Sequence, residues 1–131
     1  LCQALPFKVN SLGYISDTST MVAAYSCADL FVIPSLEDNL PNTIMESMAC
    51  GTPCVGFEIG GIPEMIDHRV NGYVANYKDA GDLANGIQWV LEHEDRLALS
   101  DACVKKVQEN YTEEVVAKQY TALYEKLLKG E

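Results

Sequence analysis

Residues 34–64 read PSLEDNLPNTIMESMACGTPCVGFEIGGIPE, and this stretch decides the fold. An apolar run over 29–33 precedes it, and a second short apolar run, Cys54–Phe57, lies inside it. The segment between the two runs has the spacing of a helix and ends at Gly51, because glycine commonly follows the last helical turn. Strand, loop, helix, strand and loop in this order predict a βαβ unit, in which the polar loops follow the carboxyl ends of parallel strands.

The loop after the first predicted strand carries groups that suit a phosphorylated, hydroxyl-rich ligand. Pro41 fits the first turn of a helix, and Asn39 lies close to the capping position. Free amides at a helix start favour an anion. Asp38 and Glu46 only accept hydrogen bonds, so hydroxyl and N–H groups are their natural partners. This pattern indicates a sugar nucleotide, although an ordinary turn followed by a solvated helical glutamate explains the same residues.

The same stretch resembles the signature of the retaining glycosyltransferases of the large GT-B family 4. That signature has Pro-Ser, a carboxylate, seven residues and a glutamate, then Ala-Met-Ala-Cys-Gly-Thr-Pro-Val and a Gly-Gly-x-x-Glu turn. The matching residues here are Pro34, Ser35, Asp38, Glu46, the run 47–53 (SMACGTP), the run 60–64 (GGIPE), and Asn71 with Gly72.

Two departures from the family pattern concern the loop. The first glutamate of the signature is Asp38 here, which is one methylene shorter. The Gly-Phe-Gly-Leu that usually follows is replaced by residues 39–42, Asn-Leu-Pro-Asn. Pro41 has no N–H, so one backbone contact to phosphate is lost. These differences affect the expected sugar contacts more than the expected ribose contact.

The resemblance implies a role for each matching position. It implies that the loop binds the donor sugar, that the signature glutamate binds the ribose, that a turn near residue 14 lies beside the base, and that a glycine loop supports the site. The corresponding residues are Asp38, Asn39, Leu40 and Asn42 for the sugar; Glu46 for the ribose; Gly13, Tyr14 and Ile15 near the base; and Gly60, Gly61 and Glu64 for the supporting loop. It implies no catalytic residue in this chain, no metal and no cofactor. Glu64 could equally complement a helix dipole.

Composition limits the classes of protein that this chain can represent. Its 131 residues form one domain at most, and 48% of them are hydrophobic, which is enough for a packed core. The net charge of −10 disfavours a nucleic-acid partner. The five cysteines include no CxxC pair, so we expect buried, reduced thiols and a cytoplasmic protein.

The rest of the chain predicts further elements of an α/β domain. We expect a strand over 7–14, a helix with Met21, Val22, Tyr25 and Ala28 on its apolar face, and a strand over 29–34. Next we expect a helix over 43–50, whose apolar stripe comprises Ile44, Met45, Met48 and Ala49. A helix start at 62–66 and a strand over 72–77 come after it. Helical spacing continues over 83–91 and 97–107, and Thr112 opens a last helix over 112–131.

Together these features predict a single, partial Rossmann-like domain over 1–131, with a parallel sheet and flanking helices. The resemblance implies that this domain is the C-terminal half of a GT-B glycosyltransferase, truncated at its N-terminal end. We expect it to bind a nucleotide-sugar donor for retaining transfer, and to be inactive without the N-terminal acceptor domain. We also expect self-association through the final helix, and a peripheral place for the full-length protein at the inner membrane. The alternatives are a non-catalytic nucleotide-sugar-binding or flavodoxin-like domain, or another GT-B enzyme such as a sugar-nucleotide epimerase or a phosphorylase.

Overall fold

A three-stranded parallel sheet forms the centre of the computed structural model, which describes residues 4–130. Its strands are β1 (Phe31–Ile33), β2 (Cys54–Phe57) and β3 (Gly72–Ala75), in the spatial order β1-β2-β3. Val32 lies opposite Val55, and Val55 lies opposite Tyr73. The sheet confirms the predicted α/β class and the predicted βαβ unit.

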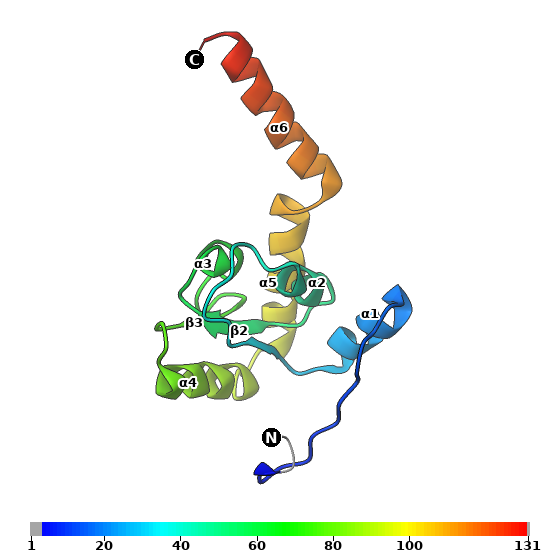
Figure 1. Cartoon of the computed structure of the whole chain (residues 1–131), viewed down its shortest axis with the longest axis vertical. Helices are drawn as coiled ribbons and strands as arrows, with labels where there is room; N and C mark the ends of the chain where they lie inside the picture. Colours follow the sequence, from blue (N-terminus) through cyan, green and yellow to red (C-terminus); the bar gives the residue numbers. More distant parts are fainter. Residues whose placement is uncertain (1–3, 131) are drawn as a thin grey trace.

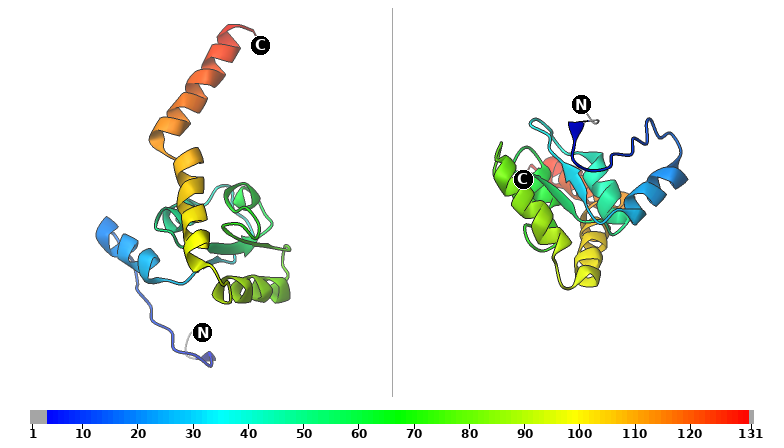
Figure 2. Two further views of the ribbon diagram at one scale, coloured as in Figure 1. Left: turned by 180° about the vertical axis from the view of Figure 1, so that it is seen from behind. Right: turned by 90° about the horizontal axis from the view of Figure 1, so that it is seen from below.

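Within residues 4–130, six helices pack around this sheet or extend from it (Figure 1). Helices α2 and α5 pack against each other on one face of the sheet, and α4 packs on the other face against β2 and β3. Helix α1 lies beside α2, whereas α6 extends away from the sheet (Figures 1 and 2). Within residues 4–130, none of the helices combines the length and the apolar character needed to cross a bilayer. The helices are α1 (Thr18–Cys27), α2 (Asn42–Ala49), α3 (Ile62–Met65), α4 (Ala80–Leu91), α5 (Arg96–Asn110) and α6 (Glu113–Leu128).

The two faces of β2 divide the core into two clusters. Cys54 belongs to the cluster on the side of α2 and α5, with Ile44 and Met48. Val55, the next residue, belongs to the cluster on the side of α4, with Tyr73 and Val90. This alternation follows from the pleat of a strand, whose successive side chains point to opposite faces. All four residues of β2 are buried, as expected for a central parallel strand.

Side chains cap four of the helices, but not α2. Asp17, Asp79, Asp95 and Thr112 each accept a hydrogen bond from a backbone amide in the first turn of α1, α4, α5 and α6, respectively. At α2 the capping position is occupied by Pro41, which makes no side-chain hydrogen bond. The amides of Asn42 and Thr43 have no protein partner within residues 4–130. The expected cap by Asn39 is not formed, so the first backbone amides of α2 are free to bind a ligand.

The predicted strand over 7–14 is wrong. This segment has no regular secondary structure and leads into α1 as an extended, exposed stretch (Figure 2). Phe7, Leu12 and Tyr14 are 65%, 66% and 94% exposed. The apolar pattern has no consequence here because, among the described residues, no strand pairs with this segment and no surface covers its side chains.

Smaller corrections concern the ends of elements and two helical stripes. Val22 and Ala28, predicted on the apolar face of the first helix, are exposed, and Ala28 lies beyond the end of α1. The strand predicted over 29–34 is limited to β1, and the strand predicted over 72–77 ends at Ala75. On α2, Ile44 and Met48 are buried as predicted, but Ala49 is exposed. Ser47 is buried instead, and its hydroxyl donates to the carbonyl oxygen of Thr52 at 3.1 Å, which offsets the cost of burying a polar group.

The cysteines of the described chain do not share one environment. Cys54 and Cys103 are buried, and burial raises the pKa of each thiol to about 12. Cys27 is exposed and Cys50 is half-buried, which corrects the expectation of uniformly buried thiols. Cys2 lies outside the described residues.

Burial predicts a clear order of thiol modification. At pH 8, a small alkylating reagent should modify Cys27 in the native protein, whereas Cys54 and Cys103 should react only after denaturation, because the thiolate is the reactive form. Peptide mass spectrometry of native and denatured samples measures this order. Modification of Cys54 in the native state at the rate seen for Cys27 would contradict the packing described here.

Helix α4 contains two glycines that predict opposite effects on stability. A Cβ at Gly86 would lie 2.5 Å from Cδ1 of Tyr73, so Gly86→Ala should destabilise the protein by about 1–3 kcal/mol through overpacking. A Cβ at Gly81 would meet only the Asp79 carboxylate at 3.2 Å, so Gly81→Ala should be neutral, or stabilising by up to about 1 kcal/mol. Urea denaturation of both variants measures the difference, and equal effects would rule out the close packing of α4 on the sheet.

Candidate functional site

The loop after β1 is held in place by the loop after β2. Gly61 donates its amide hydrogen to the carbonyl oxygen of Asn39. Gly60 has a φ of +54°, and a Cβ at this position would overlap the carbonyl oxygen of Asp38. Only glycine allows both this backbone conformation and this approach. The two loops at the carboxyl edge of the sheet therefore contact each other backbone to backbone.

A third segment fixes the other end of the same loop. The hydroxyl of Tyr77, which follows β3, donates to the carbonyl oxygen of Leu36 at 3.1 Å. Asp38 is half-buried, whereas Asn39 and Leu40 are exposed. The backbone of the loop is thus held by the segments after β2 and β3, and most of its side chains remain accessible to a ligand.

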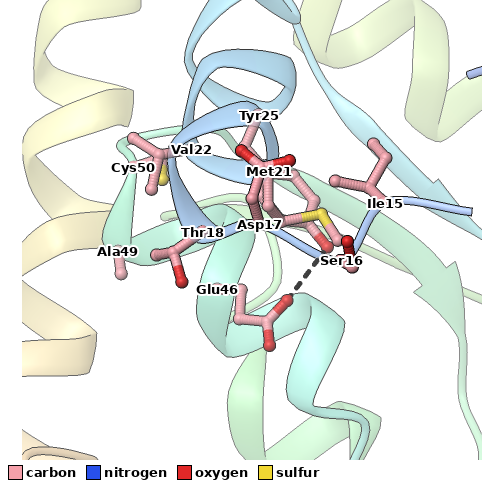
Figure 3. A pocket seen from close by; sticks show the side chains of 10 residues that line it. All are labelled: Ile15, Ser16, Asp17, Thr18, Met21, Val22, Tyr25, Glu46, Ala49 and Cys50. Atoms are coloured by element: carbon pink, nitrogen blue, oxygen red, sulfur yellow. Dashed lines mark hydrogen bonds between the residues drawn. The ribbon is translucent and has the colours of Figure 1, made fainter.

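A hollow of about 360 Å³ lies between α1 and α2 (Figure 3). This volume is at the lower end of the range of about 300–1,000 Å³ found for small-molecule sites. Glu46 enters the hollow from α2, and Ile15 enters it from the segment before α1. The other residues that line it are Ser16, Asp17, Thr18, Met21, Val22, Tyr25, Ala49 and Cys50.

Two carboxylates line this hollow, and their roles differ. Asp17 caps α1, where it accepts hydrogen bonds from the amide of Thr20 and the hydroxyl of Ser19, each at 2.8 Å. Hydrogen bonds from Thr20 and Ser19 lower the pKa of Asp17 to about 2. Glu46 is exposed, and only its Oε2 accepts a hydrogen bond within residues 4–130. Within the described residues, Oε1 of Glu46 is therefore free for a ligand, and so is Oδ1 of Asp17, because both hydrogen bonds to Asp17 end on its Oδ2.

The hydrogen bond to Glu46 comes from Tyr25 (Figure 3). The Tyr25 hydroxyl donates to Oε2 of Glu46 at 3.3 Å. Burial, followed by the charge of Glu46, raises the pKa of Tyr25 to about 12, so the phenol keeps its proton near neutral pH. The Tyr25 ring packs edge-on against Phe31 of β1, with 5.5 Å between ring centroids. The buried hydroxyl of Thr52 donates to the carbonyl oxygen of Tyr25 at 2.7 Å.

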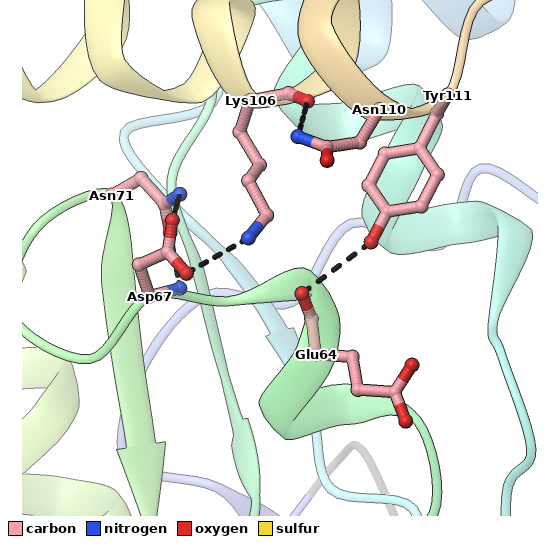
Figure 4. A network of polar contacts seen from close by, with 6 residues as sticks. All are labelled: Glu64, Asp67, Asn71, Lys106, Asn110 and Tyr111. Atoms are coloured by element: carbon pink, nitrogen blue, oxygen red, sulfur yellow. Dashed lines mark hydrogen bonds and ion pairs between the residues drawn. The ribbon is translucent and has the colours of Figure 1, made fainter. Parts of the chain in front are cut away.

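A separate polar network ties α5 to the region around α3 and β3 (Figure 4). Lys106 pairs with Asp67 at 2.8 Å, and the buried Asn71 accepts from the amide of Asp67 at 2.9 Å. The hydroxyl of Tyr111 donates to the backbone carbonyl of Glu64 at 3.4 Å. The carboxylate of Glu64 points away from this network and is exposed (Figure 4). Asn71 thus has a structural role in this turn.

The structure brings some of the predicted site residues together and separates others. Glu46 and Ile15 share the hollow, whereas Gly13 and Tyr14 are exposed and do not line it. Asp38, Asn39 and Leu40 lie with Gly60 and Gly61 at the carboxyl edge of the sheet, with Asn42 at the start of α2 and Glu64 on α3. Within residues 4–130, no group of three or more His, Cys, Asp or Glu is arranged to bind a metal ion. The roles assigned to these residues from the sequence stay predictions.

Sequence reasoning missed Tyr25 and Asp17 as part of this hollow. The helical spacing predicts only that Tyr25 lies on the apolar face of α1, and the cap by Asp17 is seen in the structure. One signal was present for Tyr25, because a buried tyrosine hydroxyl usually finds a hydrogen-bond partner. The identity of that partner depends on how α1 packs against α2, which the periodicity of either helix alone does not give.

Comparisons with known proteins agree on one family. The family model described as "Glycosyl transferases group 1" matches residues 2–93. N,N'-diacetylbacillosaminyl-diphospho-undecaprenol alpha-1,3-N-acetylgalactosaminyltransferase of Campylobacter jejuni is 31% identical over 98% of this chain, which covers 35% of that relative. The chain spans about a third of the length of this relative and of N-acetyl-alpha-D-glucosaminyl L-malate synthase of Bacillus anthracis, which is 29% identical over 95% of this chain.

Solved structures show the same fold. Sucrose-phosphate synthase from Thermosynechococcus elongatus superposes with a TM-score of 0.74 at 29% identity, over 88% of this chain and 29% of that chain. Anabaena HepE, in a crystal structure with UDP and glucose, superposes with a TM-score of 0.71 at 25% identity, over 87% of this chain and 31% of that chain. The chain belongs to the group 1 glycosyltransferases and forms part of a GT-B fold.

The contact between the two loops predicts the effect of a single methyl group. Gly60→Ala should destabilise the protein by more than about 2 kcal/mol, because the new Cβ overlaps the Asp38 carbonyl and because φ is positive. Gly13→Ala is the matched control, since Gly13 also has a positive φ but has no atom within 4 Å of an added Cβ. Its cost should not exceed about 1–2 kcal/mol. Urea denaturation measures both free energies of unfolding. A Gly60→Ala cost no larger than that of Gly13→Ala would disprove the close backbone contact between the two loops.

Proposed function

We propose that this chain, as a member of the group 1 glycosyltransferases, binds the nucleotide-sugar donor of a sugar-transfer reaction, with Glu46 accepting hydrogen bonds from the ribose hydroxyls. The observation that carries this proposal is the hollow that joins Ile15 to Glu46 beside the second half of α2. The free Oε1 of Glu46 suits a hydroxyl donor, and the mainly apolar residues of α1 suit a nucleoside.

The open start of α2 supports a place for the donor diphosphate. The amides of Asn42 and Thr43 are without protein partners within residues 4–130, and the helix dipole favours negative charge there. We place the donor sugar against Asp38, Asn39, Leu40 and Asn42, which precede or begin this helix. The crystal structures of Anabaena HepE with UDP and with UDP-glucose support a uridine nucleotide as the first candidate.

We further propose that transfer retains the anomeric configuration, needs no metal ion and requires a domain that this chain does not supply. The chain covers 35% of the Campylobacter relative, which leaves room for an acceptor site elsewhere in the natural gene product. Leu123, Tyr124 and Leu127 of α6 are more than half exposed and offer an apolar surface to such a domain or to a second copy. Because this chain does not supply the acceptor domain, the 131 residues alone should show no turnover. We also propose that the whole protein acts in the cytoplasm or at the inner face of the membrane.

Calorimetric titration of UDP, GDP and ADP into the natural gene product tests the proposed donor site. One nucleotide should bind, and Glu46→Ala should weaken its binding by about 1–3 kcal/mol, the size of a hydrogen bond to a charged group. Glu109→Ala is the control, because Glu109 is an exposed glutamate of α5 outside the hollow. Absence of binding by all three nucleotides, or equal effects of the two variants, would refute the proposed role of Glu46.

A further inference from the structure

We infer that Tyr25 is a positioning residue for nucleotide binding, whose hydroxyl orients the Glu46 carboxylate toward the ribose. The inference rests on the proposed function, and it assigns a specific role to a residue that carries no part of the family signature. Tyr25 donates to Oε2 of Glu46 at 3.3 Å, and within the described residues this is the only hydrogen bond that the Glu46 side chain makes (Figure 3).

Tyr25 has the rigidity that a positioning residue needs. Its side chain is 8% exposed, and its ring packs edge-on against Phe31. Its backbone carbonyl accepts from the buried hydroxyl of Thr52 at 2.7 Å, directly after the end of α2. The tyrosine is therefore fixed both to the sheet and to the turn that follows the helix carrying Glu46.

Glu46, in contrast, is not held in place by packing and gains from a hydrogen bond that restricts its rotamers. It is exposed on α2, and a free glutamate side chain samples several rotamers in water, which costs conformational entropy when a ligand selects one of them. The bond from Tyr25 selects rotamers that direct the carboxylate into the hollow before a nucleotide arrives. Oε1 remains available for one ribose hydroxyl, and preorganisation of this kind improves affinity by lowering the cost of ordering.

The positioning role predicts a loss confined to the ribose contact. We assign the free Oε1 of Glu46 to the ribose 2′-hydroxyl, so in the natural gene product we expect UDP to bind more tightly than 2′-deoxy-UDP, which lacks this hydroxyl. Tyr25→Phe removes the hydroxyl and keeps the ring. It should weaken UDP binding by up to about tenfold, the cost of ordering one free glutamate side chain when the ligand binds, and leave 2′-deoxy-UDP binding nearly unchanged.

The ratio of the two dissociation constants separates positioning from general structural damage. A variant that merely loosens the fold would weaken both nucleotides together and preserve the ratio, whereas loss of positioning brings the ratio toward the value for Glu46→Gln. Tyr73→Phe is the matched control, because the Tyr73 hydroxyl also donates to a carboxylate, Asp82, at 2.8 Å, but lies outside the hollow. It should leave the ratio unchanged.

The remaining outcomes decide between this inference and the function on which it rests. If UDP binds with a clear preference over 2′-deoxy-UDP and Tyr25→Phe keeps that preference, the positioning role is wrong and the donor site stands. If the wild-type protein prefers neither nucleotide, the ribose role of Glu46 is wrong. When GDP or ADP binds instead of UDP, the same comparison is made with the 2′-deoxy form of that nucleotide. If none of the three binds, the proposed function and the positioning role are both overturned.

Discussion

The buried hydrogen bond from Thr52 to the carbonyl oxygen of Tyr25 connects the parts of the structure that form the hollow. Thr52 lies between the end of α2 and the start of β2, and its own carbonyl accepts the hydroxyl of Ser47. An unpaired polar group in this interior would carry a desolvation cost of about 1–3 kcal/mol, so the pairing strongly favours one placement of α1 against α2. The distance between Tyr25 and Glu46 follows from this placement.

Much of the fold could be predicted because its signals are local. The apolar run of β2, the glycine after α2 and the polar turns between the elements are each readable over a few residues, and they define a parallel βαβ unit. The strand over 7–14 could not be judged in the same way. A strand is stable only when its backbone pairs with a neighbour, and local alternation gives no information about whether that neighbour is present. Ala49 and Ser47 show the same limit on α2, where the packing of the helix in the fold buries Ser47 and leaves Ala49 exposed.

The candidate site was predictable to the extent that it depends on single residues at fixed spacing. Glu46 and Ile15 were singled out from the sequence, and the structure places both in one hollow. Tyr25 was not singled out, because its contact with Glu46 joins residues that are 21 positions apart on two different helices. The contact of Gly60 with Asp38 likewise depends on two loops that meet only in the folded sheet. Contacts of this kind require the tertiary arrangement.

The backbone contact between the loops after β1 and β2 separates shape from chemistry. Gly60 packs against the backbone carbonyl of Asp38, and Gly61 donates to that of Asn39. Because these contacts involve only the main chain, the path of the loop does not depend on the identity of most of its side chains. Residues 38–40 can therefore exchange one functional group for another while the scaffold under them persists. Point substitutions at these positions can therefore change the chemistry of this surface without new insertions or a redesigned core. The substitution of the usual family glutamate by Asp38 is the kind of change that such an arrangement tolerates.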